Sequence, residues 1–170
     1  MSQDLKKELR KLWNWINKCN DCKPSYEPKP KPKPLLLFNS RPEVMIVSER
    51  PSLRKDTIWC GLDRIPKFEK VLQPLLARKC YLTNVVKCPA PSGMNKINKH
   101  RLSKCYQWIK QELQIVRPKK IIALGYWAGF WLTLNHIEHY FLPHPSWILR
   151  FKRDSLWQYV RQLKREILDN

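Results

Sequence analysis

The chain has 170 residues, of which 33 are Lys or Arg and 14 are Asp or Glu, and its formal net charge is +19. This length fits a single domain, residues 1–170, around one hydrophobic core, so a second domain is not expected. The excess of positive charge opposes compaction unless a polyanion is the usual partner, which favours nucleic acid. The longest mostly apolar run, Ile121 to Leu132, is too short to cross a bilayer. We therefore expect a soluble monomer without a membrane partner, in the cytoplasm of its own cell or, for a viral protein, of the host.

Apolar residues at the start of the chain recur every three or four positions, from Leu5 to Ile16. This spacing predicts an amphipathic helix from Ser2 to about Asn17. The helix leads to the pair Cys19-Asn-Asp-Cys22, after which prolines alternate with lysines up to Pro34. Because proline-rich segments cannot enter a sheet and favour an extended conformation, we interpret residues 23–34 as a basic strap on the surface.

Strands and helices are predicted to alternate over the rest of the chain. The expected strands are Val44 to Val47, Tyr81 to Val86, Lys120 to Gly125 and Glu138 to Leu142. The expected helices are Phe68 to Leu76 with a kink at Pro74, Leu102 to Val116, Tyr126 to Leu134 and Asp154 to Ile167. This order predicts a three-layer α/β/α fold with a central, mostly parallel four-stranded sheet. Ligands bind such sheets at the carboxyl ends of the strands. Polar loops at 48–52, 84–87 and 144–146 follow three of the strands and should meet at one rim.

Six cysteines in a reducing compartment are more often metal ligands or small buried residues than disulfides. Two residues separate Cys19 from Cys22, which lets both thiolates bind one metal centre, and sixteen separate Cys88 from Cys105. Four soft ligands suit either zinc or an iron-sulfur cluster, and unrelated buried thiols are the alternative. The two other cysteines, expected in the core, are Cys60 and Cys80.

Taken together, these motifs resemble the uracil-DNA glycosylase superfamily, and specifically its iron-sulfur branch, family 4. The matching segments are Cys19-x-x-Cys22, Val44 to Ser52, Tyr81-Leu-Thr-Asn-Val-Val-Lys-Cys88, Cys105, Pro118 to Gly125 with Ala128, and His144-Pro-Ser146 followed by Leu149-Arg150. The resemblance implies a DNA repair hydrolase that cleaves the N-glycosidic bond of uracil, or of a related damaged base, flipped out of DNA, and leaves an abasic site. It also implies a structural four-iron, four-sulfur (4Fe-4S) cluster on Cys19, Cys22, Cys88 and Cys105.

Asn84 and His144 are the expected contacts to the base. The amide of Asn84 offers one acceptor and two donors, the complement of a uracil edge, and the resemblance implies that it reads the flipped base. An Asn that closes a turn is the alternative. His144, between two prolines, would donate a hydrogen bond to uracil O2 as negative charge develops there. A metal-binding or core histidine is the alternative.

Glu49 follows the first expected strand, where its carboxylate could orient water or stabilise an oxocarbenium-like sugar. Equally, it could neutralise Arg50. Trp59 is the best match to the aromatic platform that the family places against the base, although the loop here is shorter. The family motif Gly-Glu-Ala-Pro-Gly is replaced by Ser48-Glu-Arg-Pro-Ser52, so Ser48 and Arg50 would reshape the pocket or admit another base.

The segment that follows the His-Pro-Ser motif contains four candidate DNA-binding residues. Trp147 and Leu149 could wedge into the space that a flipped base leaves, or could begin the last helix. Arg150 and Lys152 could hold phosphates, and a merely solvated basic face is the alternative. The altered loop at 48–52 keeps two other functions open: a catalytically altered protein that binds uracil or abasic sites in single- or double-stranded DNA, and a base-modifying transferase on the same scaffold.

Overall fold

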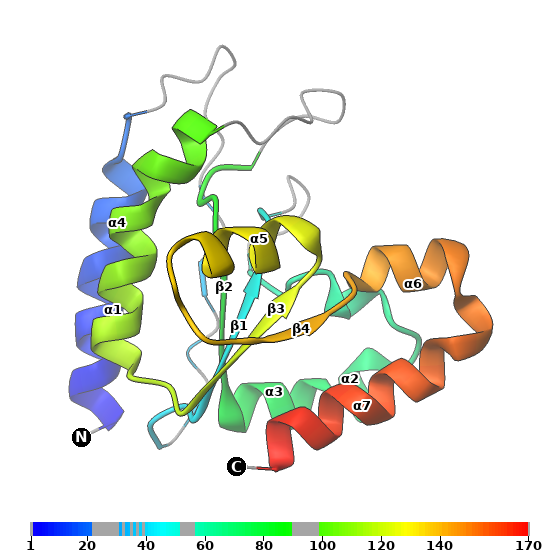
Figure 1. Ribbon diagram of the computed structural model, residues 1–170. Coiled ribbons are helices and arrows are strands. Elements are labelled where there is room, and N and C mark those ends of the chain that lie inside the picture. Colours follow the sequence, from blue (N-terminus) through cyan, green and yellow to red (C-terminus); the bar gives the residue numbers. More distant parts are fainter. Residues whose placement is uncertain are drawn as a thin grey trace.

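The computed structural model describes residues 2–21, 31, 33, 34, 36, 38, 40–51, 57–89 and 99–169, with the side chains of 2 and 99–102 excepted. Most of the predicted strap at 23–34, and Cys22 with it, lies outside the described residues. In chain order the elements are α1 (Ser2–Lys18), β1 (Val44–Ser48), η1 (Leu62–Arg64), α2 (Phe68–Val71), α3 (Gln73–Lys79), β2 (Cys80–Asn84), α4 (Lys99–Val116), β3 (Lys120–Leu124), α5 (Tyr126–Leu134), β4 (Tyr140–Leu142), α6 (Pro145–Phe151), η2 (Arg153–Ser155) and α7 (Leu156–Leu168) (Figure 1).

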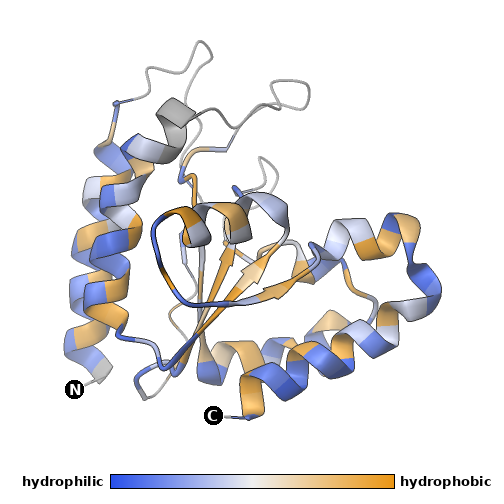
Figure 2. Ribbon diagram, viewed as in Figure 1, coloured by the Kyte–Doolittle hydropathy of each residue, from blue (hydrophilic) through white to orange (hydrophobic). Residues whose placement is uncertain are grey.

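The four strands form one parallel sheet in the order β2-β1-β3-β4. Val44 at the start of β1 lies opposite Cys80 in β2 and Lys120 in β3, so these three strands begin and end at the same level. Apolar and β-branched residues favour strands that are buried on both faces, and they form the apolar centre seen in Figure 2. The predicted three-layer α/β/α class with a parallel four-stranded sheet is confirmed.

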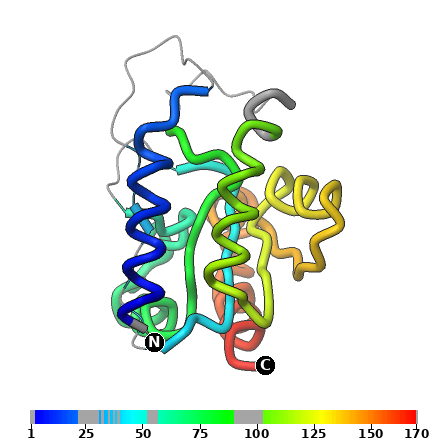
Figure 3. The backbone as a smooth tube through the Cα atoms, turned by 90° about the vertical axis from the view of Figure 1, so that its left-hand side faces the viewer, coloured from blue at the N-terminus to red at the C-terminus, as the bar shows by residue number. Residues whose placement is uncertain are grey.

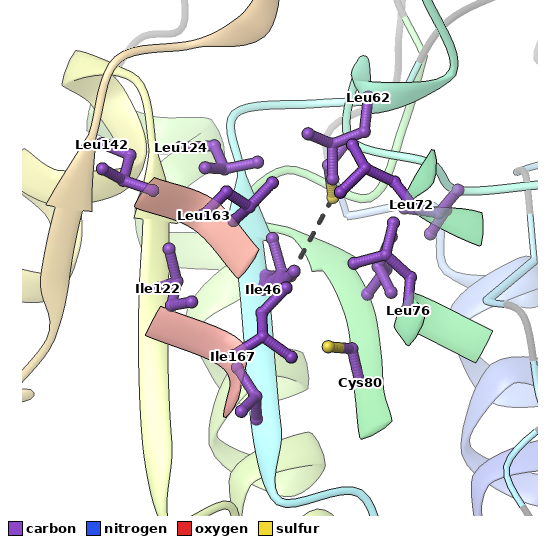
Figure 4. Close-up of a cluster of buried hydrophobic side chains, with 14 of the residues drawn as sticks. Ile46, Leu62, Leu72, Leu76, Cys80, Ile122, Leu124, Leu142, Leu163 and Ile167 are labelled. Carbon is purple, nitrogen blue, oxygen red and sulfur yellow. Dashed lines mark hydrogen bonds between the residues drawn. The ribbon is translucent and has the colours of Figure 1, made fainter. Parts of the chain in front are cut away.

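Helices cover both faces of the sheet, and alternate residues of each strand point to opposite faces. Ile46 and Ile122 belong to the hydrophobic cluster under α2, α3, α6 and α7 (Figure 4). Met45 and Ala123 belong to the cluster under α4 and α5. Helix α1 contributes side chains to both clusters. Helices therefore cover both faces of the sheet, and the edge strand β4 keeps Tyr140 and Phe141 exposed.

Helix α1 lies side by side with α4, and the two run in opposite directions (Figures 1 and 3). Gln107 Nε2 in α4 donates a hydrogen bond to Asp21 Oδ2, just after α1, at 3.1 Å. The end of α1 is thereby held beside the first turns of α4. Within the described part of the chain, no helix has the length and apolar character needed to cross a membrane.

Several elements differ from the prediction, beginning with β2, which ends at Asn84 and not at the expected Val86. The single kinked helix expected at Phe68 to Leu76 is two helices, α2 and α3, which meet at Leu72 (φ −123°), and Pro74 lies in the first turn of α3. Proline fits that position because the first helical turn has no intrahelical acceptor for its missing N–H. Strand β4 is shorter than expected, and a separate helix, α6, precedes the last one because Pro145 starts a helix directly after the His144 cap.

Candidate active site

The carboxyl ends of β1 and β2 place Ser48 and Asn84 next to each other. They are partners in the parallel register, so their side chains point to the same face of the sheet. The pairing continues beyond the strands, because Val85 N–H donates to Ser48 O at 2.8 Å and Val86 N–H donates to Glu49 O at 3.0 Å. The backbone behind these side chains is therefore fixed.

The Asn84 side chain is buried, with 1% of its surface exposed, yet among the described residues neither Oδ1 nor Nδ2 has a hydrogen-bond partner. Ser48 Oγ is in the same condition. Leaving a buried polar group without a partner costs roughly 1–3 kcal/mol. Proteins retain such an unpaired group where a bound ligand supplies the missing hydrogen bonds. An amide offers that ligand both a donor and an acceptor. An Asn that closes a turn needs a hydrogen bond from its side chain to nearby backbone, and among the described residues the Asn84 side chain makes none.

His144 follows β4 and caps α6. Its Nδ1 accepts a hydrogen bond from Ser146 N–H at 3.2 Å, which leaves the proton of the neutral ring on Nε2. Burial, with a smaller contribution from the Arg64 charge, lowers the pKa of His144 to about 4. At neutral pH the imidazole is therefore uncharged and can donate one hydrogen bond from Nε2.

Two glycines that the sequence analysis did not identify enclose His144. A Cβ on Gly61 would lie 2.8 Å from His144 Cε1, and a Cβ on Gly125 would lie 2.9 Å from His144 Cβ. Both glycines have left-handed φ angles, +77° and +90°. One signal was available for Gly125, because the whole chain has only four glycines and this one lies where a predicted strand ends and a predicted helix begins. Both glycines bring backbone against the imidazole where no other residue fits.

The segment before η1 joins the two parts of the site. Cys60 Sγ lies 3.3 Å from Thr83 O, directly before Asn84, and the next residue, Gly61, touches His144. Cys60 is buried, as is Cys80, in agreement with the prediction that both belong to the core. The Trp59 ring packs edge-on against Phe68, with centroids 5.0 Å apart, and remains partly exposed. Its role as a base platform stays a prediction.

Glu49 lies at the edge of this site, partly buried. Burial raises the pKa of its carboxyl group, and the adjacent Arg50 opposes that rise. Arg50 Nε is 3.6 Å from Glu49 Oε1. The ion pair with Arg50 that the sequence analysis considered is thus present, and a carboxylate poised to act on water is equally compatible with this position.

Behind Asn84 lies a buried charged network that the sequence analysis missed. Lys87 Nζ donates to Glu112 Oε2 at 2.6 Å, to Thr83 Oγ1 at 2.7 Å and to the Asn84 carbonyl at 2.8 Å. Lys87 is 2% exposed and Glu112 is 0% exposed. Tyr81 Oη donates to Glu112 Oε1 at 2.8 Å, and Trp13 Nε1 of α1 donates to Tyr81 Oη at 2.9 Å. The network connects α1 and α4 to the strand end that carries Asn84.

The predicted cluster ligands come from elements whose ends lie on one side of the protein (Figures 1 and 3). Cys19 and Cys88 are partly buried and Cys105 is buried, whereas Cys22 lies outside the described residues. The described residues contain no group of three or more His, Cys, Asp or Glu side chains arranged to hold a metal ion. The hydrogen bond from Gln107 to Asp21 brings the segment that continues to Cys22 beside the helix of Cys105. Thiolates are suitable donors for an iron-sulfur cluster, and the cluster itself stays a prediction.

Helix α6 carries the predicted DNA contacts. Trp147, Arg150 and Lys152 are exposed, and Leu149 is partly buried against the core. Trp147 and Leu149 lie in α6 and not in the last helix, α7, so the alternative that they begin the last helix is wrong, and the wedge role stays a prediction. Because His144 caps α6, the helix begins at the carboxyl end of the sheet.

The fold and the site define an α/β protein with a buried, unpartnered amide and a neutral imidazole at the carboxyl edge of a parallel sheet. A family model described as "Uracil DNA glycosylase superfamily" matches residues 36–166, and the chain belongs to that superfamily.

Curated relatives place the chain close to family 4. A type-4 uracil-DNA glycosylase from Pyrobaculum aerophilum is 29% identical over 124 residues, which cover 69% of this chain and 61% of the relative. A type-4 uracil-DNA glycosylase from Archaeoglobus fulgidus is 28% identical over 97 residues, or 54% of this chain and 47% of the relative. A type-5 uracil-DNA glycosylase from P. aerophilum is 38% identical over 48 residues, 28% of this chain and 20% of the relative. The chain thus spans less than two thirds of the length of these relatives.

Proposed function

We propose that the protein is a DNA glycosylase that hydrolyses the N-glycosidic bond of uracil, or of a related damaged base, in DNA. The observation that carries the proposal is the buried amide of Asn84, which has no described hydrogen-bond partner and lies at the same edge of the sheet as the neutral imidazole of His144. Superfamily membership and the relatives named uracil-DNA glycosylases support it.

Asn84 would recognise the base through the edge that distinguishes uracil from cytosine. With Oδ1 accepting from uracil N3–H and Nδ2 donating to O4, both orphaned atoms gain partners. Cytosine has an acceptor at N3 and a donor at N4, so it would pair only with the amide turned by 180°, and rejection of cytosine requires that the bound state hold the amide in the uracil orientation. Ser48 Oγ, which also has no described partner, is close enough in register to add a contact.

His144 would stabilise the leaving base. As the bond between N1 and the sugar breaks, its electron pair moves into the uracil ring and charge builds up on O2. The Nε2–H of a neutral imidazole donates to that oxygen without releasing its proton. Water then adds to the sugar carbon, and Glu49 is placed to orient this water or to stabilise the cationic sugar. A structural 4Fe-4S cluster would be held by Cys19, Cys22, Cys88 and Cys105.

The direct test is strand scission at an abasic site. Single- and double-stranded oligonucleotides with one uracil are incubated with protein and then treated with alkali. We expect cleavage at the uracil, and a decrease of roughly 100-fold or more for Asn84→Ala and for His144→Ala. Asn14→Ala, on the exposed face of α1, is the matched control and should cleave normally.

A second function, a protein that binds uracil or abasic sites without cleavage, is favoured by one observation. The carboxylate proposed to act on water, Glu49, is paired with Arg50 at 3.6 Å. Tight binding of uracil-containing DNA without scission would establish this second function and refute the first. If the original protein does not cleave and the Arg50→Ala variant does, the Glu49–Arg50 ion pair is the cause of the inactivity.

A further inference from the structure

Helix α5 presents aromatic rings and no charge to the surface. The sequence of Tyr126–Leu134 is Tyr-Trp-Ala-Gly-Phe-Trp-Leu-Thr-Leu, without a single charged residue in a chain of net charge +19. Ala128 and Leu132 face the core, whereas Tyr126 is 67% exposed and Phe130 is also exposed. Core packing therefore accounts for the inner side of α5 and leaves its outer aromatic rings without a structural role.

The outer rings of α5 are ordered relative to one another. Tyr126 and Phe130, one helical turn apart, are stacked with centroids 5.9 Å apart and planes inclined by 12°. Trp127 meets both rings edge-on, at 5.4 Å and 6.0 Å. Contacts of this kind fix the ring orientations, so a flat ligand that stacks on Tyr126 finds a surface that is already arranged.

This aromatic surface begins at the wall of the base-binding site. Tyr126 follows Gly125, whose backbone packs against His144. On the other side of His144, α6 exposes a second aromatic pair, Trp147 and Phe151, with centroids 6.0 Å apart. In Figure 1, α5 and α6 start from the ends of β3 and β4 and run in opposite directions.

Basic side chains accompany the second pair. Arg64, Arg150, Lys152 and Arg153 are exposed on η1, α6 and η2. The guanidinium of Arg150 lies 5.8 Å from the centre of the Phe151 ring. Bases stack on aromatic rings while lysine and arginine neutralise phosphates, and this combination is typical of sites for single-stranded nucleic acid.

We propose that the aromatic face of α5, formed by Tyr126 and Phe130, stacks with an unpaired base next to the flipped nucleotide, so that single-stranded DNA is the preferred substrate. The reference to a flipped nucleotide rests on the proposed function; the binding of unpaired DNA does not. In a duplex, the bases next to the flipped one are paired and stacked inside the helix, so the ring faces of α5 cannot reach them. A duplex would then be held through its phosphates alone.

The test uses DNA without uracil, so its outcome is independent of cleavage. Affinity of the whole protein for a fluorescent single-stranded oligothymidine and for a duplex of equal length is measured by anisotropy at fixed salt. We expect Tyr126→Ala to weaken single-strand binding roughly tenfold to a hundredfold and to leave duplex binding unchanged. Tyr126→Phe, which keeps the ring, should bind as the original protein does. Trp15→Ala removes a ring of equal exposure, 67%, from α1 and is the matched control.

Three outcomes would overturn the proposal: unchanged single-strand affinity in Tyr126→Ala, an equal loss for duplex and single strand, or an equal loss in Trp15→Ala. Thermal unfolding of each variant verifies that it is folded. Sedimentation of the protein alone tests another occupant, because a dimer that Tyr126→Ala dissociates would mean that this face binds a second copy. If uracil is not cleaved but single strands still bind through Tyr126, the proposed activity fails and the stacking of unpaired DNA on α5 stands.

Discussion

The buried pair of Lys87 and Glu112 gives the sharpest prediction for stability. Replacing Glu112 by Gln retains the shape of the side chain but removes the charge that neutralises Lys87, whose Nζ is 2.6 Å from Glu112 Oε2. Removing one partner of a buried ion pair typically costs about 3–5 kcal/mol, because the other charge is left without compensation. A domain is stabilised by only about 5–15 kcal/mol in total, so a large share of the folding free energy is at risk.

Urea unfolding followed by circular dichroism measures the free energy of unfolding of each variant. We expect Glu112→Gln and Lys87→Met each to lose about 3 kcal/mol or more. The double variant, Lys87→Met with Glu112→Gln, leaves neither charge of the pair, so it should lose much less than the sum of the two single losses. Losses below about 1 kcal/mol in both single variants, or a double variant that loses the full sum, would refute the reasoning.

Three further predictions concern the site. Gly61→Ala should displace His144, because its Cβ would lie 2.8 Å from His144 Cε1. The loss of excision rate, expressed as a free energy, should therefore exceed the loss of unfolding free energy. Steady-state cleavage and urea unfolding check this, and equal losses would contradict it. Because burial lowers the pKa of His144 from 6.5 to about 4, the unfolded chain takes up the proton first, and the stability present above pH 6.5 should fall by up to roughly 3 kcal/mol as the pH drops towards 4. His144→Gln should flatten that dependence in urea titrations at pH 7 and 4.5, and identical slopes would count against it. Cys88→Ala should lower iron content, stability and activity, whereas Asn84→Ala should lower activity alone. Iron analysis of protein purified without air, together with unfolding and cleavage assays, distinguishes the two variants. An iron-free original protein would exclude the cluster.

The sheet could be predicted because local sequence patterns determine its strands. Val44 to Val47 and Lys120 to Gly125 are short apolar runs between turn signals, and alternation with helical periods leaves few arrangements other than a parallel sheet. The meeting of polar strand ends at one edge followed from that topology. The register that pairs Ser48 with Asn84 comes from the structure, and His144 reaches the same edge through the ends of β3 and β4.

The missed features depend on contacts between distant segments. Glu112 lies one turn from the apolar Ile109 and Val116, so it shares the buried face of α4, but only the fold shows that Lys87 and Thr83 meet it there. The importance of Gly61 likewise comes from His144, far along the chain. A glycine in the sequence signals unusual backbone, and the side chain that requires it belongs to another element.

The pairing of α1 with α4 also bears on the order in which the chain folds. Helix α1 is made first, yet its partner begins only at Lys99, and the strand that accepts the hydrogen bond from Trp13 ends at Asn84. Contacts so distant in sequence form late, because a long loop must close before they yield any energy. The first helix should therefore be among the last to dock, and until it does, the Lys87–Glu112 pair stays within reach of water. Hydrogen exchange during refolding should show β1 and β2, whose paired residues Val44 and Cys80 are closer in the sequence, protected before α1.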